Sequence, residues 1–494
     1  MPNIEIKDVN LGGLSDSKYQ GIANSVATLV GLDIHSEPGV IKVNQALTKS
    51  SGSTVDDDIS AIVCSSNGHT YFFGRNLGKI YKRSSSGVWS SLGTVTPAAG
   101  AVGILDAKEY GGRIYFATQS RIGYLDAADV IVNNFATFTN TDAEYHPMVV
   151  KNLILYIGDK NYVAQIENTT FTADALDLES QYRISSLATF GYVLVIGTFV
   201  KDTVNDVKIF TWNDWSRSFS TEDVVKQPGI FCFLNEDNYV IAYIGTKGYF
   251  HQFDGNRLIP YKRLPGDWLG TNKMDIKLNA TAYFQGRSMF GVSNNSGNPC
   301  LQGVYSIGSY ASNYPNVAAL EYIISTGNTS NIVIGAMEAS GDTLYVAWRD
   351  ANSGTSYGVD IIDTSNKAPV AYMETRVITG DRLIGKQVAV EVPYRTLSYE
   401  DSDLLLETGD GLLLETGDGL LQESSVVQSI AIAVAQDHGA MTTVSGTLVD
   451  AIHMVVRTDG AVVKDAKAIQ VRVTLASTGG NTAAEIEGVI IKTD

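Results

Sequence analysis

Residues 191–197 read GYVLVIG, in which two glycines enclose five strongly β-forming residues. The same form, a turn residue, then a patch rich in Tyr, Phe, Ile and Val, then a small residue, recurs along the chain. The other copies are GHTYFFG (68–74), GRIYFAT (112–118), NLILYIG (152–158), YVIAYIG (239–245), GRSMFGV (286–292) and GDTLYVA (341–347). Successive copies lie about 45 residues apart on average, which indicates a repeat architecture.

Each copy has further strand-like patches around it. A second patch follows some ten to seventeen residues later, as in KIYKRS from residue 79 and VKIFTW from residue 207. A third patch precedes it, as in ISAIVC from residue 59. Three to four strands in about 45 residues is the period of a propeller blade. Residues 55–370 are therefore predicted to form a β-propeller of about seven blades, or six if one unit is irregular, whose packed sheets account for the many Tyr and Phe residues without a ligand.

The flanking segments have different patterns. Residues 1–54 show weak periodicity and predict an extended N-terminal arm with one helical turn near residues 22–29. Residues 371–494 contain alternating apolar and polar stretches separated by turn residues, such as KAIQVRVTLAS from residue 467, and predict a small antiparallel β-sandwich. The predicted fold class is all-β. Whether the arm lends a strand to the last blade is left open by the sequence.

Composition limits the function. The formal net charge of −17 and the pI near 4.8 argue against a protein that holds nucleic acid by neutralising phosphates. Cys64, Cys232 and Cys300 are far apart and predict small buried side chains rather than disulfides or a zinc site. The first residues lack a basic stretch followed by an apolar one, so the chain is expected to fold in a cytoplasm.

A leucine repeat, LLLETGDGLLLETGDGLLQES at residues 404–424, interrupts the predicted sandwich. Thr-Gly-Asp-Gly breaks each apolar triplet, which excludes a membrane span and predicts strands joined by turns. Such a ribbon is apolar on both faces and needs a cover. The subunit-interface hypothesis assigns this role to seven leucines: Leu404, Leu405, Leu406, Leu412, Leu413, Leu414 and Leu420. The alternative is a linker folded onto its own domain.

The layout resembles the tail nozzle or hub proteins of short-tailed bacteriophages. The likeness rests on an arm with Gly-Gly-Leu, a long propeller, the segment YMETRVITGDRLIGKQVAVEVPY from residue 372, and the closing strands IQVRVTLAS and AEIEGVIIK. It implies a structural virion protein, made in the host bacterial cytoplasm, that forms a homo-oligomeric ring. That ring would extend the portal or adaptor, contact fibres or spikes, and line the DNA exit channel without binding DNA tightly.

Catalytic and metal-binding motifs are weak. Asp214 in WNDWS lies between Trp212 and Trp215, a pattern compatible with glycoside hydrolysis or sugar stacking, but no partner carboxylate can be assigned. None of the six histidines has ligand spacing. Asp56–Asp58 lacks a calcium-loop frame, and Asp410 and Asp418 resemble calcium-binding repeats only loosely. The sequence predicts no enzyme, no cofactor and no metal, and a carbohydrate-binding propeller is the alternative function.

Overall fold

The computed structural model divides the chain into two compact units. Unit 1 comprises Met1–Ala46, Ser309–Tyr322 and Asp363–Asp494, and unit 2 comprises Leu47–Gly308 and Ile323–Ile362. The structure describes residues 4–19, 21–96, 103–201, 207–235, 239–265, 273–294, 301–311, 314–379, 387–395, 430–437, 439–444, 446–450, 455–458, 463–464, 467–476 and 485–493.

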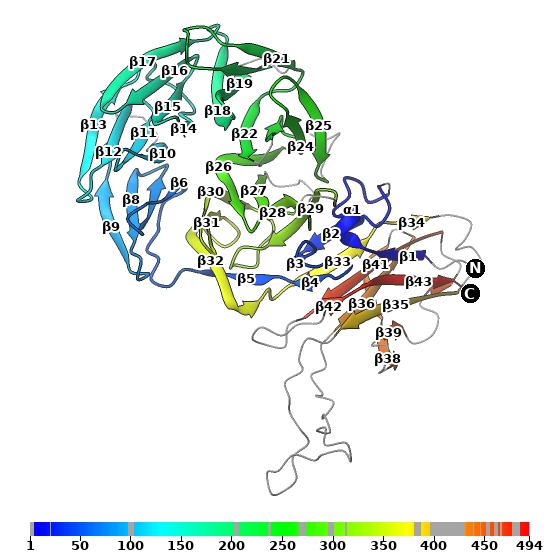
Figure 1. Ribbon diagram of the computed structural model, residues 1–494. Helices are drawn as coiled ribbons and strands as arrows, with labels where there is room; N and C mark the ends of the chain where they lie inside the picture. Colours follow the sequence, from blue (N-terminus) through cyan, green and yellow to red (C-terminus); the bar gives the residue numbers. More distant parts are fainter. Residues whose placement is uncertain are drawn as a thin grey trace, which may run out of the picture. The chain divides into compact units, whose positions relative to one another are not determined.

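Unit 2 is a β-propeller whose seven blades follow one another in chain order around a ring (Figure 1). Blades 1 to 3 are β6 (Ile59–Cys64), β7 (Thr70–Gly74), β8 (Lys79–Arg83) and β9 (Trp89–Thr94); β10 (Ile104–Tyr110), β11 (Arg113–Thr118), β12 (Arg121–Leu125) and β13 (Ile131–Thr137); and β14 (Met148–Lys151), β15 (Ile154–Asp159), β16 (Tyr162–Glu167) and β17 (Thr170–Asp177). Blades 4 and 5 are β18 (Tyr182–Phe190), β19 (Val193–Val200), β20 (Val207–Trp212) and β21 (Thr221–Val225); and β22 (Ile230–Asn235), β23 (Val240–Ile244), β24 (Tyr249–Phe253) and β25 (Leu258–Arg263). Unit 2 contributes β26 (Met274–Phe284), β27 (Arg287–Asn294) and β28 (Gly303–Gly308) to blade 6, and β30 (Ile332–Ser340), β31 (Thr343–Asp350) and β32 (Ser356–Lys367) to blade 7.

The sequence repeat marks the second strand of every blade, so the predicted all-β propeller is confirmed with seven blades. Strand β7 is buried at all five positions, as is β23. Both faces of such a strand are covered because neighbouring blades pack on either side of its sheet. This explains why the segments are continuously apolar rather than alternating.

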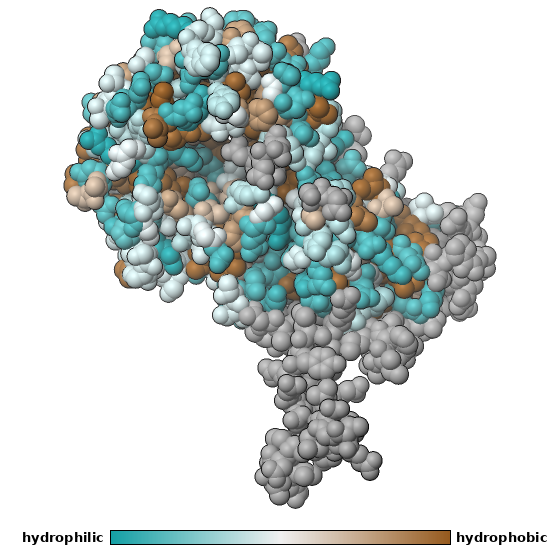
Figure 2. All heavy atoms as spheres, viewed as in Figure 1, coloured by the Kyte–Doolittle hydropathy of each residue, from teal (hydrophilic) through white to brown (hydrophobic). Residues whose placement is uncertain are grey.

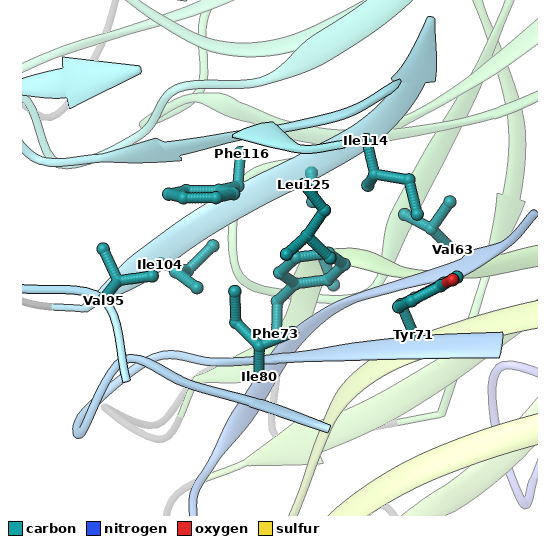
Figure 3. Close-up of a cluster of buried hydrophobic side chains, with 11 residues drawn as sticks. Val63, Tyr71, Phe73, Ile80, Val95, Ile104, Ile114, Phe116 and Leu125 are labelled. Atoms are coloured by element: carbon teal, nitrogen blue, oxygen red, sulfur yellow. The ribbon is translucent and has the colours of Figure 1, made fainter. Parts of the chain in front are cut away.

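The core lies between adjacent blades. Figure 3 shows the cluster between blades 1 and 2, where Tyr71 and Phe73 of β7 meet Ile114 and Phe116 of β11. Similar clusters join blades 2 and 3, 3 and 4, and 4 and 5. Each blade is thereby stabilised by its neighbours, as in other repeat folds.

The ring closes through a strand from the N-terminal side of blade 1. Strand β5 (Gln45–Lys49) follows β32 in the sheet order of blade 7. Within unit 2, the amide of Ser50 donates to the carbonyl of Val359 at 2.8 Å, and Lys49 Nζ donates to the carbonyl of Tyr357 at 2.9 Å. A cluster containing Phe72 of blade 1 and Tyr345 of blade 7 fills the seam, where β6 and β30 lie side by side in Figure 1.

Five first strands share a β-bulge directly after an isoleucine. Pairing with the second strand shifts between Ile59 and Ala61, Ile104 and Asp106, Ile184 and Ser186, Ile230 and Cys232, and Ile334 and Ala336. A bulge adds one unpaired residue and redirects its side chain. The bulged residues are Ser60, Leu105, Ser185, Phe231 and Gly335. A Cβ on Gly335 would lie 2.0 Å from the carbonyl oxygen of Ile59, so this close approach of blades 7 and 1 requires glycine.

Unit 1 contains two main sheets, mostly antiparallel, built largely from both ends of the chain. The first has the order β1 (Ile4–Lys7), β43 (Gly488–Thr493), β35 (Gln387–Arg395), β39 (Val455–Thr458) and β38 (Gly446–Asp450), with β40 (Val463–Lys464) and β42 (Glu485–Ile486) also on β35. The second has the order β37 (Thr442–Val444), β36 (Ile430–Gln436), β41 (Ala468–Leu475), β33 (Ala371–Thr375), β2 (Val26–Val30) and β29 (Val317–Tyr322), with β34 (Ile378–Thr379) on β41. A small pair, β3 (Leu32–Asp33) with β4 (Lys42–Val43), and the short helix α1 (Val9–Gly12) complete the unit.

The N-terminal segment differs from its prediction in one respect. A helical turn was expected near residues 22–29, but Val26–Val30 is strand β2 and the single turn of helix is at Val9–Gly12. The VATLV sequence is rich in β-branched residues, and pairing with β33 and β29 satisfies its backbone. Sequence patterns suggested boundaries at 54/55 and 370/371, whereas the structure groups Met1–Ala46 with the C-terminal residues. The eight leucines of the repeat, among them the seven of the subunit-interface hypothesis, lie outside the described residues.

Candidate functional site

Asp214, the candidate carboxylate of the sequence, is bound by blade 3. It lies in the β20–β21 turn with φ 64° and accepts a hydrogen bond from Lys151 Nζ at 2.7 Å and another from the Tyr156 hydroxyl at 2.8 Å. The Lys151 side chain is only 3% exposed. Burial and the Asp214 carboxylate raise the pKa of Tyr156, so its hydroxyl keeps the proton that it donates. Asp214 therefore links blades 3 and 4.

The flanking tryptophans have separate roles. Trp212 is buried and donates from Nε1 to the carbonyl of Ser216 at 2.7 Å, whereas Trp215 is 89% exposed. The two indoles therefore do not form one sugar-stacking platform.

The same constellation occurs at two other places. Asp129, in the β12–β13 turn of blade 2 with φ 63°, accepts from the Tyr71 hydroxyl at 2.7 Å and from Lys82 Nζ at 2.6 Å, both of blade 1. Burial opposes ionisation of Asp129, but Lys82 and Tyr71 lower its pKa overall. Burial and Asp129 raise the pKa of Tyr71 to about 12. We call these arrangements Tyr–Asp–Lys latches.

Asp56 forms the third latch, with Tyr81 and Lys79. Its two neighbours point elsewhere: Asp57 accepts the amides of Asn76 and Leu77, and Asp58 lies 3.7 Å from Arg349. The run Asp56–Asp58 thus does not converge on a cation. Within the described ranges, no group of three or more His, Cys, Asp or Glu side chains could hold a metal ion. Asp410 and Asp418 lie outside those ranges.

A small cavity of about 70 Å³ lies where the first strands of the blades meet. Four of the bulged residues, Ser60, Leu105, Phe231 and Gly335, line it. The bulges therefore shape the wall of this central cavity.

The three carboxylates of the cavity wall have different cationic partners. Asp58 pairs with Arg349, Glu144 lies 3.6 Å from Arg183, and Asp275 pairs with Lys277. Burial raises the pKa of Asp58 in spite of its partner. Among the described residues, each of these carboxylates thus has a cationic side chain within 4 Å.

Asn279 connects its own blade 6 to blades 1 and 2. Residues 277–280 of β26 face the single residue Gly291 of β27, so this stretch projects from the sheet. Asn279 Nδ2 donates to the Ser60 carbonyl and to Asp106 Oδ1, both at 2.8 Å. Asp106 Oδ2 accepts the amide of Met148 at 2.7 Å. Burial raises the pKa of Asp106 to about 6. These bonds join blades 1, 2, 3 and 6.

The histidines and cysteines also fit structural roles where they are described. His146 is buried, stacks on Phe138, and has its ring nitrogens 2.7 Å from the Gly158 carbonyl and 3.1 Å from the Gln119 carbonyl. Burial lowers its pKa. Cys232 is buried and Cys64 half-buried, both as free thiols. Cys300, His438 and His453 lie outside the described residues.

A search for a membrane-crossing helix, restricted to the described residues, found none of sufficient length and apolar character.

Comparison with known proteins gives no family. No family model and no curated protein matches the chain. Among solved structures, it is similar to a chain of the mitotic checkpoint complex (12% identity, 64% of this chain and 92% of that chain covered, TM-score 0.44) and to streptogramin B lyase (11%, 64% and 97%, TM-score 0.44). Virginiamycin B lyase from Staphylococcus aureus is similar at 11% identity, covering 64% of this chain and 98% of that chain, with a TM-score of 0.45.

Proposed function

We propose that this chain is a structural, non-enzymatic subunit of the tail of a short-tailed bacteriophage, in the nozzle or hub. In this role a homo-oligomeric ring extends the portal or adaptor, contacts fibres or spikes, and lines the channel through which DNA leaves the virion. The arrangement of arm, propeller and C-terminal strands, with its resemblance to nozzle proteins, supports this assignment.

The structural role is supported mainly by the partners of the polar groups in the propeller. In the WNDWS turn and beside the central cavity, acidic side chains bind residues of other blades. Asp214 is held by Lys151 and Tyr156, and Asp106 by Asn279 and the Met148 amide. Groups used in this way stabilise a rigid body and are not available to a substrate. This is the property that a ring component needs.

The charge of the chain suits passage of DNA. A net charge of −17 repels phosphates at close range and opposes adhesion to the channel wall. Contacts with DNA are therefore expected to be transient.

Sedimentation and negative-stain imaging of the purified full chain test the proposal. We expect ring-shaped oligomers with one central opening. A chain that stays monomeric at all concentrations contradicts it.

A carbohydrate-binding propeller is the second candidate, and one observation favours it. Trp215 presents its indole almost fully to solvent on a turn that is fixed by the Asp214 latch. Aromatic faces of this kind stack on sugar rings. A glycan array probed with the wild-type chain and with Trp215→Ser separates the two candidates, because only a lectin shows glycan signals that depend on Trp215.

A further inference from the structure

Three large apolar side chains are almost fully exposed at the same end of blades 3 and 4. Leu153 in the β14–β15 turn is 84% exposed, Tyr192 in the β18–β19 turn 87%, and Trp215 in the β20–β21 turn 89%. In a four-stranded antiparallel blade, the first and third turns lie at one end and the second turn at the other. We call these three residues the tip patch. Figure 2 shows hydrophobic side chains interspersed with hydrophilic ones over the propeller surface.

Leu153 is placed at a cost to folding. It has φ 60° and follows Asn152 at φ 50°, a turn in which both residues adopt the left-handed region. At the corresponding position, blade 2 has Gly112 and blade 6 has Gly286, the residue type that adopts this region without strain. Leu153 is the only aliphatic side chain at positive φ in the part of the chain that the structure describes. An exposed leucine at such a position brings no stability to the monomer, which points to a contact with another molecule.

The backbone that carries the tip patch is held firmly. The Leu153 carbonyl accepts the Tyr110 hydroxyl at 2.8 Å. Trp215 follows Asp214, whose bond to Lys151 connects this turn to the strand just before Leu153. Preorganised apolar anchors lose little entropy on association, and Trp and Tyr are among the residue types that contribute most to interfaces.

We propose that the tip patch binds the leucine repeat, residues 404–424, of a second copy of this chain. The inference rests on the ring of the proposed function for its biological setting. The repeat places eight leucines within eighteen residues, and the strands and turns that its sequence predicts would be apolar on both faces. It belongs to the 34 residues 396–429, which begin and end on strands of unit 1, so the repeat near their middle can extend about 55 Å from those strands.

Charge agrees with this occupant. Each unit of the repeat carries a glutamate and an aspartate, such as Glu407 and Asp410. Arg217, two residues after Trp215, is 76% exposed and pairs only loosely with the exposed Asp174, at 3.5 Å. The acidic residues of the repeat can therefore pair with Arg217 while its leucines cover Trp215 and Leu153.

The test is sedimentation velocity of the full-length chain across a concentration series. Leu153→Gly relieves the left-handed strain, so we expect a melting temperature about 2 °C higher together with weaker association. The pair Tyr192→Ser and Trp215→Ser should weaken association at least ~10-fold, the usual effect of losing an interface anchor. Leu77→Ser is the matched control. Leu77 is 50% exposed in the β7–β8 turn, at the opposite end of its blade, and its variant should associate like the wild type.

A synthetic peptide of residues 401–426 serves as competitor, and it should dissociate wild-type oligomers. Replacing Leu404, Leu406, Leu412 and Leu414 by serine should weaken association as the tip-patch variants do. Combining these serine replacements with a tip-patch variant should weaken association no further, because both changes remove the same contact.

The outcomes separate this inference from the ring itself. Rings that form equally well with an altered tip patch overturn the inference and leave the proposed function standing. A monomeric wild type overturns the proposed function. In that case, a peptide that binds wild type but not the Tyr192/Trp215 variant still supports the tip-patch inference. Glycan binding that depends on Trp215, without any peptide binding, overturns that inference.

Discussion

The three Tyr–Asp–Lys latches predict a graded series of stabilities, because the same chemistry occurs at three depths. In the Asp214 latch the lysine and aspartate side chains are 3% and 15% exposed, in the Asp129 latch 19% and 24%, and in the Asp56 latch 31% and 57%. Removing the carboxylate of a buried pair leaves a buried ammonium without a counter-charge, which typically costs about 3–5 kcal/mol. Removing one partner of an exposed pair typically costs at most about 1 kcal/mol, because water replaces it.

Asp214→Ala is therefore expected to lower the free energy of unfolding by about 3–5 kcal/mol. Asp56→Ala is expected to lower it by at most about 1 kcal/mol, and Asp129→Ala by an intermediate amount. Urea unfolding followed by tryptophan fluorescence and by circular dichroism measures all three under one condition. Adding Lys151→Met to Asp214→Ala should restore much of the loss, since no buried charge is left unpaired.

Equal losses for Asp56→Ala and Asp214→Ala would refute the argument from burial. A gain in stability on replacing Asp214 would refute the structural role itself, because strained functional carboxylates often behave in that way. That result would return Asp214 to the catalytic candidates.

Three further outcomes are expected. For Asp106, whose pKa burial raises from an ordinary value near 4 to about 6, the folded chain holds the proton more strongly than the unfolded chain. The stability that this group contributes is therefore complete below about pH 4 and is lost as the pH rises through 6. In urea titrations, the free energy of unfolding of wild type relative to that of Asp106→Asn should fall by up to ~3 kcal/mol between pH 4 and 7. A difference that stays constant with pH contradicts the assignment. Gly335→Ala should lower the melting temperature more than Gly341→Ala, because a Cβ at 335 meets the Ile59 carbonyl whereas one at 341 meets nothing within 4 Å and adds only backbone strain. In electrophoretic mobility shifts at physiological salt, the full chain should leave duplex DNA unshifted at micromolar protein, and a salt-sensitive shift would count against the channel role.

The fold was predictable from sequence where burial is complete. The second strands, such as β19 with GYVLVIG at its start, are covered on both faces, and their unbroken apolar character is visible without alignment. The outer strands β9 and β13 are half-exposed, and WSSLGT and IVNNFAT carry little periodic signal. The sequence does not reveal the pairing of strand β5, because its partner β32 lies some 300 residues away and no local pattern indicates such a pairing.

The candidate site was predictable to a smaller degree. The tryptophans on either side drew attention to Asp214, but its partner Lys151 is 63 residues away and carries no motif. Asp129 performs the same task within DAADV, a stretch without any aromatic residue. The sequence indicates the position of such an aspartate only by a turn between two strand patches. This pattern does not reveal which side chains the carboxylate binds.

Closure of blade 7 by β5 has a consequence for biosynthesis. Lys49 and Tyr357, which hydrogen-bond in the finished ring, are separated by 308 residues. At about 5–20 residues per second, the ribosome needs roughly 15–60 s to deliver β32 after β5 has been made. Throughout this interval β5 is an unpaired strand edge, open to pairing with β32 of another nascent chain on the same messenger. Crowded polysomes should therefore favour exchange of β5 between chains, and slower initiation should favour closed single rings.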